Sequence, residues 1–235
     1  MPQKPGWCLH IKLDPSEAGT WLNRFGAPFE PWIEEGPDGH YLRSSKLEAL
    51  TDEDEVRAAG NDMLNVMNGV ASLLGMRKRA SGLGAVLVRA DGTRHIFMRI
   101  EGAVIGFVVG EMRVSTGTTD SSPPVASNFQ TMAAKAASNP LLSEALVSFG
   151  QDESWFNLYS TIETIENLFG GEKELLALRM VEPSSLKLAK RTANAHRHPP
   201  SSFEAPPKPM PFGEARELVR RLLAAAMASA NGRST

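Results

Sequence analysis

Alternating apolar and polar side chains mark the first half of the chain as β-rich. Apolar residues occupy every second position of residues 7–13: Trp7, Leu9, Ile11 and Leu13. This period of two is typical of a half-buried strand. Short strands are also predicted at 29–34 and 41–43, joined through a turn-forming cluster of Gly, Pro and Asp. A hairpin is predicted at 85–100 around Asp91-Gly92, a dipeptide suited to a turn with positive φ, and residues 103–114 extend the same antiparallel sheet.

One long helix is expected within this β-rich half, besides a short helical stretch around Trp21 to Phe25. Thr51 and Asp54 resemble a capping box, and apolar residues continue from Val56 to Leu74 at helical spacing. Gly82-Leu83-Gly84 precedes a strand instead of following one, so it is interpreted as a turn and not as a nucleotide-binding loop. Residues 116–124 are small, polar and proline-containing, which predicts a linker. The predicted domains are therefore 1–118 and 125–235.

Helical periodicity dominates after the linker. Helices are predicted at 127–137, 140–150, 155–169, 174–180, from Ser184 or Ser185 to about Arg197, and around 218–226. Pro199-Pro200 forbids continuation of the penultimate helix. Trp155 and Tyr159 fall on an apolar stripe and are predicted to be core residues. The predicted fold class is α+β: an N-terminal antiparallel β-sheet with one packed helix, followed by a C-terminal helical bundle.

The amino-acid composition limits the classes of protein to which this chain can belong. The chain is 42% hydrophobic and 22% charged, which is ordinary for a folded globular protein. A single cysteine, Cys8, excludes an intramolecular disulfide framework and a cysteine-based zinc site, and it is expected to act as a small apolar residue. The sequence shows neither a run of apolar residues long enough to span a bilayer nor a signal peptide. A cytoplasmic protein with no membrane partner is predicted.

Charge is unevenly distributed along the chain. From residue 182 to 235 there are nine Lys or Arg against four Glu, a net charge of +5, which leaves −7 for the rest of a chain of net charge −2. A basic tail on an acidic body is compatible with a polyanionic partner. It is equally compatible with contact between the two halves or between two subunits.

One short cluster carries the candidate chemistry: Arg191-Thr192-Ala193-Asn194-Ala195-His196. Arg191 and His196 stand in an Arg-x-x-x-x-His spacing on the penultimate predicted helix. In spacing and placement this resembles the HEPN family of small helical domains, over roughly residues 127–229. The resemblance implies a metal-independent endoribonuclease or RNA-binding protein of bacterial defence or toxin–antitoxin biology. It further implies a homodimer through the helical half, with no metal and no cofactor.

The residue types suit RNA chemistry. Arg191 offers a planar fork of donors that can stabilise charge on a scissile phosphate. Histidine is the usual side chain for proton transfer, so His196 can act on the 2′-hydroxyl or the leaving oxygen. The family usually has Asn, Asp or His directly after the arginine; this chain has Thr192 there, and the nearest amide is Asn194. Four further residues are expected to hold the RNA: Lys187, Lys190, Arg197 and His198.

Several interpretations of this cluster remain open. Five residues along a regular helix correspond to about 140° of rotation, so Arg191 and His196 do not share a face. The helix unwinds before Pro199, or the site is shared between subunits, or His198 is the partner of Arg191. Cations at this helix end also stabilise it by themselves, and the spacing of His196 and His198 supplies two metal ligands but no third. Whether the chain is an enzyme is open as well, since the alternative function is a non-catalytic interaction or regulatory protein with a protein partner.

Overall fold

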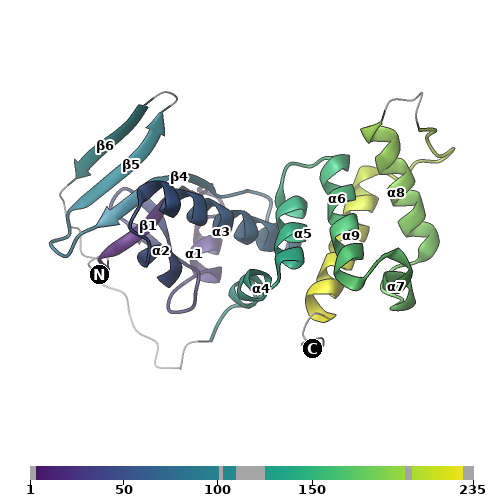
Figure 1. Cartoon of the computed structure of the whole chain (residues 1–235), viewed down its shortest axis with the longest axis horizontal. Helices are drawn as coiled ribbons and strands as arrows, with labels where there is room; N and C mark the ends of the chain where they lie inside the picture. The colour runs from purple at the N-terminus through teal and green to yellow at the C-terminus, as the bar shows by residue number, and fades with distance from the viewer. Residues whose placement is uncertain (1–3, 101–102, 110–124, 199–202, 230–235) are drawn as a thin grey trace. The chain divides into compact units, whose positions relative to one another are not determined.

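The computed structural model places two compact units along the 235-residue chain, of which residues 4–100, 103–109, 125–198 and 203–229 are described. The sheet unit comprises Met1–Met67 and Met76–Ala134, and the helical unit comprises Asn68–Gly75 and Lys135–Thr235. The predicted linker, 116–124, and the end of the strand predicted at 103–114 lie outside the described residues. The α+β fold class is confirmed (Figure 1).

Six antiparallel strands form the sheet in the order β2-β3-β1-β4-β5-β6. Their bounds are β1 Gly6–Lys12, β2 Trp32–Gly36, β3 Gly39–Arg43, β4 Ser81–Val88, β5 Arg94–Ile100 and β6 Ala103–Val109. Every strand that alternation predicts is present. Gly82-Leu83-Gly84, predicted as a turn, is instead part of β4, where Gly82 pairs with Ile11. A glycine is needed there because a Cβ on Gly82 would lie 3.2 Å from Leu9 Cδ2 and against the Asn61 side chain.

Helix α3, Glu53–Leu73, covers one face of this sheet, here called the helix face. A Cβ on Gly60 would lie 3.0 Å from the Leu9 Cβ, so the helix and strand β1 approach closely at that glycine. Val56 packs with Trp7 and Ala85 in a buried cluster. The helix begins with a cap from Asp52, whose Oδ1 accepts from the backbone N–H groups of Asp54 and Glu55 at 2.9 and 3.0 Å, and not from the predicted Thr51.

The sheet unit holds three helices besides α3 among its described residues, of which only α2 was not predicted. The others are α1, Ala18–Arg24, the four-residue α2, Ser45–Glu48, and the start of α4, Asn128–Ala137. Ser44 caps α2 by accepting from the Leu47 N–H at 3.2 Å. Gln130 of α4 donates through Nε2 to the carbonyl oxygens of Gly26 and Phe29 at 2.7 and 2.8 Å. The sequence predicts a domain boundary between residues 118 and 125. The compact units instead assign the start of α4 to the sheet unit and the end of α3 to the helical unit.

The opposite face of the sheet, here called the second face, is also buried. It carries Cys8, Tyr41, Val86, Val88 and Ile96, which form one apolar cluster. Arg94, on β5, contacts Tyr41, on β3, through a 2.7 Å bond from Nη1 to the phenol oxygen. In a flat sheet these residues would be about 14 Å apart across the strands and about 13 Å along them, beyond the combined reach of the two side chains. The sheet must therefore coil toward the second face, which helps to bury it.

The helical unit contains the rest of the chain, with α5 Pro140–Gly150, α6 Trp155–Phe169, α7 Glu172–Ala177, α8 Pro183–Arg197 and α9 Phe212–Ser229. The bounds of α5, α6 and α8 agree closely with the predicted helices, whereas α7 ends before the predicted 180 and α9 begins before the predicted 218. Asn139 caps α5 ahead of Pro140, and Gly170, with φ of 90°, ends α6. Helices α6 and α8 pack antiparallel, because the start of α6 contacts the end of α8 and the end of α6 contacts its middle.

Candidate functional site

Helix α8 carries all of the predicted site residues except His198, which follows it. The helix is regular through Arg197, and the His198 N–H donates to the Asn194 carbonyl at 3.0 Å as the helix ends. The helix therefore does not unwind before Pro199 in a way that reorients His196. Within one chain, Arg191 and His196 point about 140° apart around the helix axis. Both side chains are exposed.

Two residues of the predicted site take part in packing. The Lys190 ammonium donates to both carboxylate oxygens of Glu166, at 2.7 and 2.9 Å, and to Glu172 at 2.6 Å. Burial lowers the pKa of Lys190, but these bonds outweigh it, so that the pKa is raised and the charge is held inside the unit. Thr192 is buried, and its hydroxyl accepts from the Met210 N–H at 3.0 Å. Thr192 thus anchors the loop before α9.

The end of α8 lies on aromatic rings of α6. His196 stacks on Trp155 with ring centroids 5.0 Å apart and planes 3° from parallel. The Arg197 guanidinium carbon lies 4.1 Å from the ring centroid of Tyr159 and 5.0 Å from that of Phe156. We call these five residues the aromatic–cation surface.

The aromatic–cation surface is open to solvent. Phe156 is 60% exposed, His196 is exposed, and Trp155, Tyr159 and Arg197 are half-buried. The prediction that Trp155 and Tyr159 are core residues is therefore only partly correct. Sequence analysis missed Phe156 because it falls outside the apolar stripe of α6; the signal available was three aromatic residues within five positions, 155–159.

Three of the predicted site residues lie on a different face of α8 from His196. Lys187 and Arg191 are exposed, four residues apart, and Asn194 is half-buried three residues further on. At these spacings they share one face of the helix. Arg191 and Asn194 are thus on the same side, whereas His196 is on the aromatic–cation surface. His198 is exposed and lies against Phe203, with ring centroids 6.3 Å apart.

A separate group of polar side chains lies on the second face of the sheet and is called here the Asp38 cluster. Asp38 accepts hydrogen bonds from the Tyr41 hydroxyl and from Arg94 Nη1. His10 stacks on the Tyr41 ring at 5.0 Å. Burial and the bond to Asp38 raise the pKa of Tyr41, and burial lowers the pKa of His10. The Cys8 thiol is buried with a pKa raised to about 12, chiefly by burial, so it is not a nucleophile.

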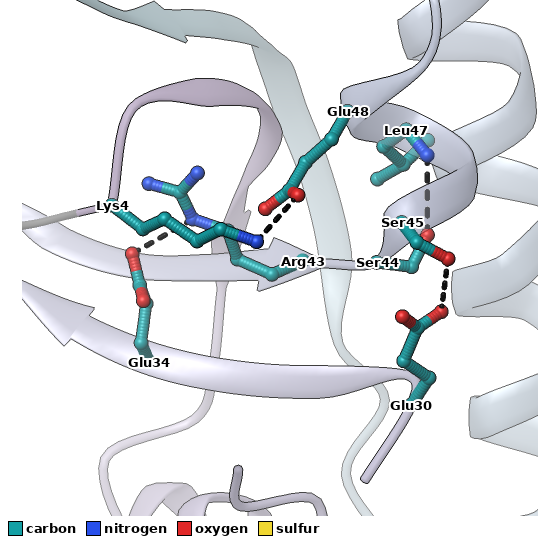
Figure 2. A network of polar contacts seen from close by, with 8 residues as sticks. All are labelled: Lys4, Glu30, Glu34, Arg43, Ser44, Ser45, Leu47 and Glu48. Atoms are coloured by element: carbon teal, nitrogen blue, oxygen red, sulfur yellow. Dashed lines mark hydrogen bonds and ion pairs between the residues drawn. The ribbon is translucent and has the colours of Figure 1, made fainter. Parts of the chain in front are cut away.

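Two further ion pairs of the sheet unit are drawn in Figure 2. Arg43, on β3, is completely buried, and its Nε donates to Glu34 Oε1 at 2.9 Å. Lys4 donates to Glu48 Oε2 at 2.7 Å and lies 5.9 Å from the Trp32 ring centroid. Sequence patterns did not identify these residues, since a strand arginine is usually exposed.

The Asp38 cluster makes the free energy of unfolding depend on pH in the acidic range. Burial raises the pKa of Asp38, but the bonds from Arg94 and Tyr41 outweigh it, and the pKa lies below its ordinary value of 3.8. A carboxyl whose pKa is lowered by folding stabilises the fold above its unfolded pKa and loses that contribution as the pH falls.

We expect Asp38→Asn to lower the free energy of unfolding by an amount that is constant above about pH 5 and shrinks below pH 3.8. Urea titrations at several pH values measure it. Asp62→Asn, on exposed α3 surface, controls for net charge. A difference between wild type and Asp38→Asn that grows as the pH falls would contradict the assignment.

The structure thus defines an α+β protein with a six-stranded sheet unit and a helical unit. Comparison with known proteins gives no matching family model, no matching curated protein and no matching solved structure. In the part of the chain that the structure describes, no helix is long and apolar enough to cross a membrane. The same residues contain no group of three or more His, Cys, Asp or Glu placed to hold a metal ion.

Proposed function

We propose that the helical unit binds single-stranded RNA at the aromatic–cation surface. The observation that carries this proposal is the exposed stack of His196 on Trp155, beside Arg197 and the 60% exposed ring of Phe156. Exposed rings next to cations suit unpaired bases, because each base has a π-face to stack and each phosphate a negative charge to neutralise.

Cations elsewhere on α8 supply further positive charge for an RNA backbone. Lys187 and Arg191 are exposed on a different face of α8 from His196, and residues 182–235 carry a net charge of +5, against −4 for residues 135–181. Such cations bind phosphates without sequence preference, and the stacked rings would favour single strands over duplexes. The affinity is expected to fall with salt.

The geometry of one chain favours binding over cleavage. A ribonuclease needs its proton-transfer group and its phosphate clamp within hydrogen-bond reach of one phosphodiester. Arg191 and His196 diverge by about 140° on a regular helix, and His196 is already stacked on Trp155. A homodimer through the helical unit, which the HEPN resemblance implies, remains the arrangement that would join Arg191 of one chain to His196 of its partner.

Incubation of end-labelled RNA with the purified protein separates these functions. We expect wild type to shift RNA on a native gel and His196→Ala to shift it less, and we expect the RNA to stay intact, with or without a chelator, in wild type, Arg191→Ala and His196→Ala. Chelator-resistant cleavage that both substitutions abolish would establish the nuclease instead. Absence of any shift, together with a change in oligomeric mass on Phe156→Ala, would assign the surface to a protein partner.

A further inference from the structure

Arg197 is held by aromatic rings and leaves its hydrogen-bond donors unused. Its guanidinium carbon lies over the ring of Tyr159, 4.1 Å from the centroid, and 5.0 Å from the centroid of Phe156. Its nitrogens neither hydrogen-bond to nor form an ion pair with any residue that the structure describes. By contrast, Arg216 and Arg220 of α9 each donate to a side-chain oxygen, at 2.8 and 2.7 Å. Within the described part of the chain, Arg197 therefore carries a full set of N–H donors without an acceptor.

These donors can be reached from solvent. Arg197 is half-buried, and the buried polar atoms that lack a partner among the described residues all belong to the sheet unit. The free nitrogens of Arg197 are therefore not enclosed. The rings beside them are open as well, since Phe156 is 60% exposed and His196 is exposed. One ligand can thus contact the guanidinium and a ring at the same time.

The rings restrict the guanidinium before any RNA binds. A cation on a freely moving side chain follows the charge of the phosphates and discriminates little between bases. A guanidinium held against aromatic rings keeps fewer orientations and presents a planar fork of donors, so that less freedom is lost for each hydrogen bond formed. Such a fork favours a partner with two acceptors side by side.

The four RNA bases differ in what they offer this fork. Guanine presents two adjacent acceptors, O6 and N7, and is the base that arginine contacts most often. Adenine has an amino donor beside its N7, and uracil has no two adjacent acceptors. Cytosine presents N3 and O2 on its pairing edge, but its single ring offers a smaller face for stacking. Guanine therefore combines a large stacking face with the acceptor pair.

We propose that the aromatic–cation surface prefers RNA with unpaired guanine, and that Arg197 is the residue that determines this preference. The guanine stacks on Phe156 or His196, and its O6 and N7 accept from the Arg197 guanidinium. Because the guanidinium carbon is 5.0 Å from the Phe156 centroid, a base on that ring, or the next base of the strand, lies within reach of the donors. This preference rests on the proposed function, RNA binding by the helical unit, and goes beyond it by naming the base.

Fluorescence anisotropy of the full chain with labelled single-stranded RNAs tests the preference. The RNAs are uridine oligonucleotides of about ten nucleotides whose central pair is guanine, adenine, cytosine or uracil. Adenine supplies the large face without the acceptor pair, and cytosine supplies an acceptor pair on a smaller face. The guanine RNA should bind at least about fivefold more tightly than the adenine RNA. Replacement of guanine by 7-deazaguanine, which stacks similarly but lacks the N7 acceptor, should remove most of this difference.

A conservative variant locates the preference in the protein. Arg197→Lys keeps the charge but not the planar fork, so it should bind the uridine RNA within about twofold of wild type and lose the preference for guanine. Arg221→Lys is the matched control, because Arg221 is an exposed arginine of α9 outside the aromatic–cation surface. It should retain the preference of wild type. The 7-deazaguanine RNA keeps the test valid if Arg197→Lys does not fold.

The possible results separate the preference from RNA binding itself. Equal affinity for the guanine and adenine RNAs, or an unchanged preference in Arg197→Lys, would overturn the role of Arg197 and leave RNA binding in place. A cytosine RNA that binds as tightly as the guanine RNA would overturn guanine as the preferred base. Failure of every RNA to bind would overturn the proposed function, and the preference with it.

Discussion

Gly69→Ala is expected to lower the free energy of unfolding of the helical unit by about 3 kcal/mol or more. Helix α3 crosses α5 at Gly69. The two backbones are so close there that a Cβ on Gly69 would lie 2.6 Å from the Leu146 carbonyl carbon and would also meet the carbonyl oxygen. Gly150 lies against it, where its own Cβ would be 2.6 Å from Gly69 Cα. Both obstacles are backbone atoms, so relief requires the two helices to separate.

The helix propensity of alanine does not rescue this substitution. Alanine exceeds glycine by about 1 kcal/mol in a helix interior, which is less than the cost of the overpacked crossing. Gly213→Ala is the matched control, because Gly213 is also helical, belongs to the same unit and has open space where a Cβ would lie, with no atom within 4 Å. It should leave stability unchanged or raise it by up to about 1 kcal/mol. Urea unfolding followed by circular dichroism measures both, and equal effects would show that the α3–α5 crossing is looser than the structure indicates.

Most of the fold follows from local patterns in the sequence. Alternation located the strands of the sheet, Asp91-Gly92 located the β4–β5 hairpin, and proline and glycine located helix ends at Pro140 and Gly170. Helix α2 was missed because four residues are too few to show a period, and its only signal was Ser44 as a cap. Gly82 was misassigned because its role is tertiary: it allows Asn61 and Leu9 to approach.

The candidate sites were less accessible to sequence analysis, because their geometry depends on contacts between distant residues. The cations of α8 were identified, but Lys190 is held by Glu166, 24 residues earlier, and nothing local indicates this. Arg43 looks like an exposed strand residue until the fold buries it completely and pairs it with Glu34 of β2. Periodicity predicts which residues face a core, whereas pairing of buried charges requires the folded chain.

Phe156→Ala is expected to weaken binding of single-stranded RNA by about tenfold or more, since stacking of one base on an aromatic side chain contributes about 1–3 kcal/mol. Phe156 is 60% exposed, so its removal should leave the fold intact. The stack of His196 on Trp155 would remain, which confines the loss to one ring of the surface. Fluorescence anisotropy with a labelled single-stranded oligonucleotide, and with a duplex of the same sequence, measures the effect.

Leu178→Ala provides the matched control for this experiment. Leu178 is also an exposed apolar residue of the helical unit, but it follows α7 and lies outside the aromatic–cation surface. Its substitution should leave the affinity for RNA unchanged. The duplex should bind more weakly than the single strand and should respond less to Phe156→Ala, because its bases are already stacked on one another. Equal losses in the two variants, or none in Phe156→Ala, would place RNA binding elsewhere and leave the aromatic–cation surface as a site for a protein partner.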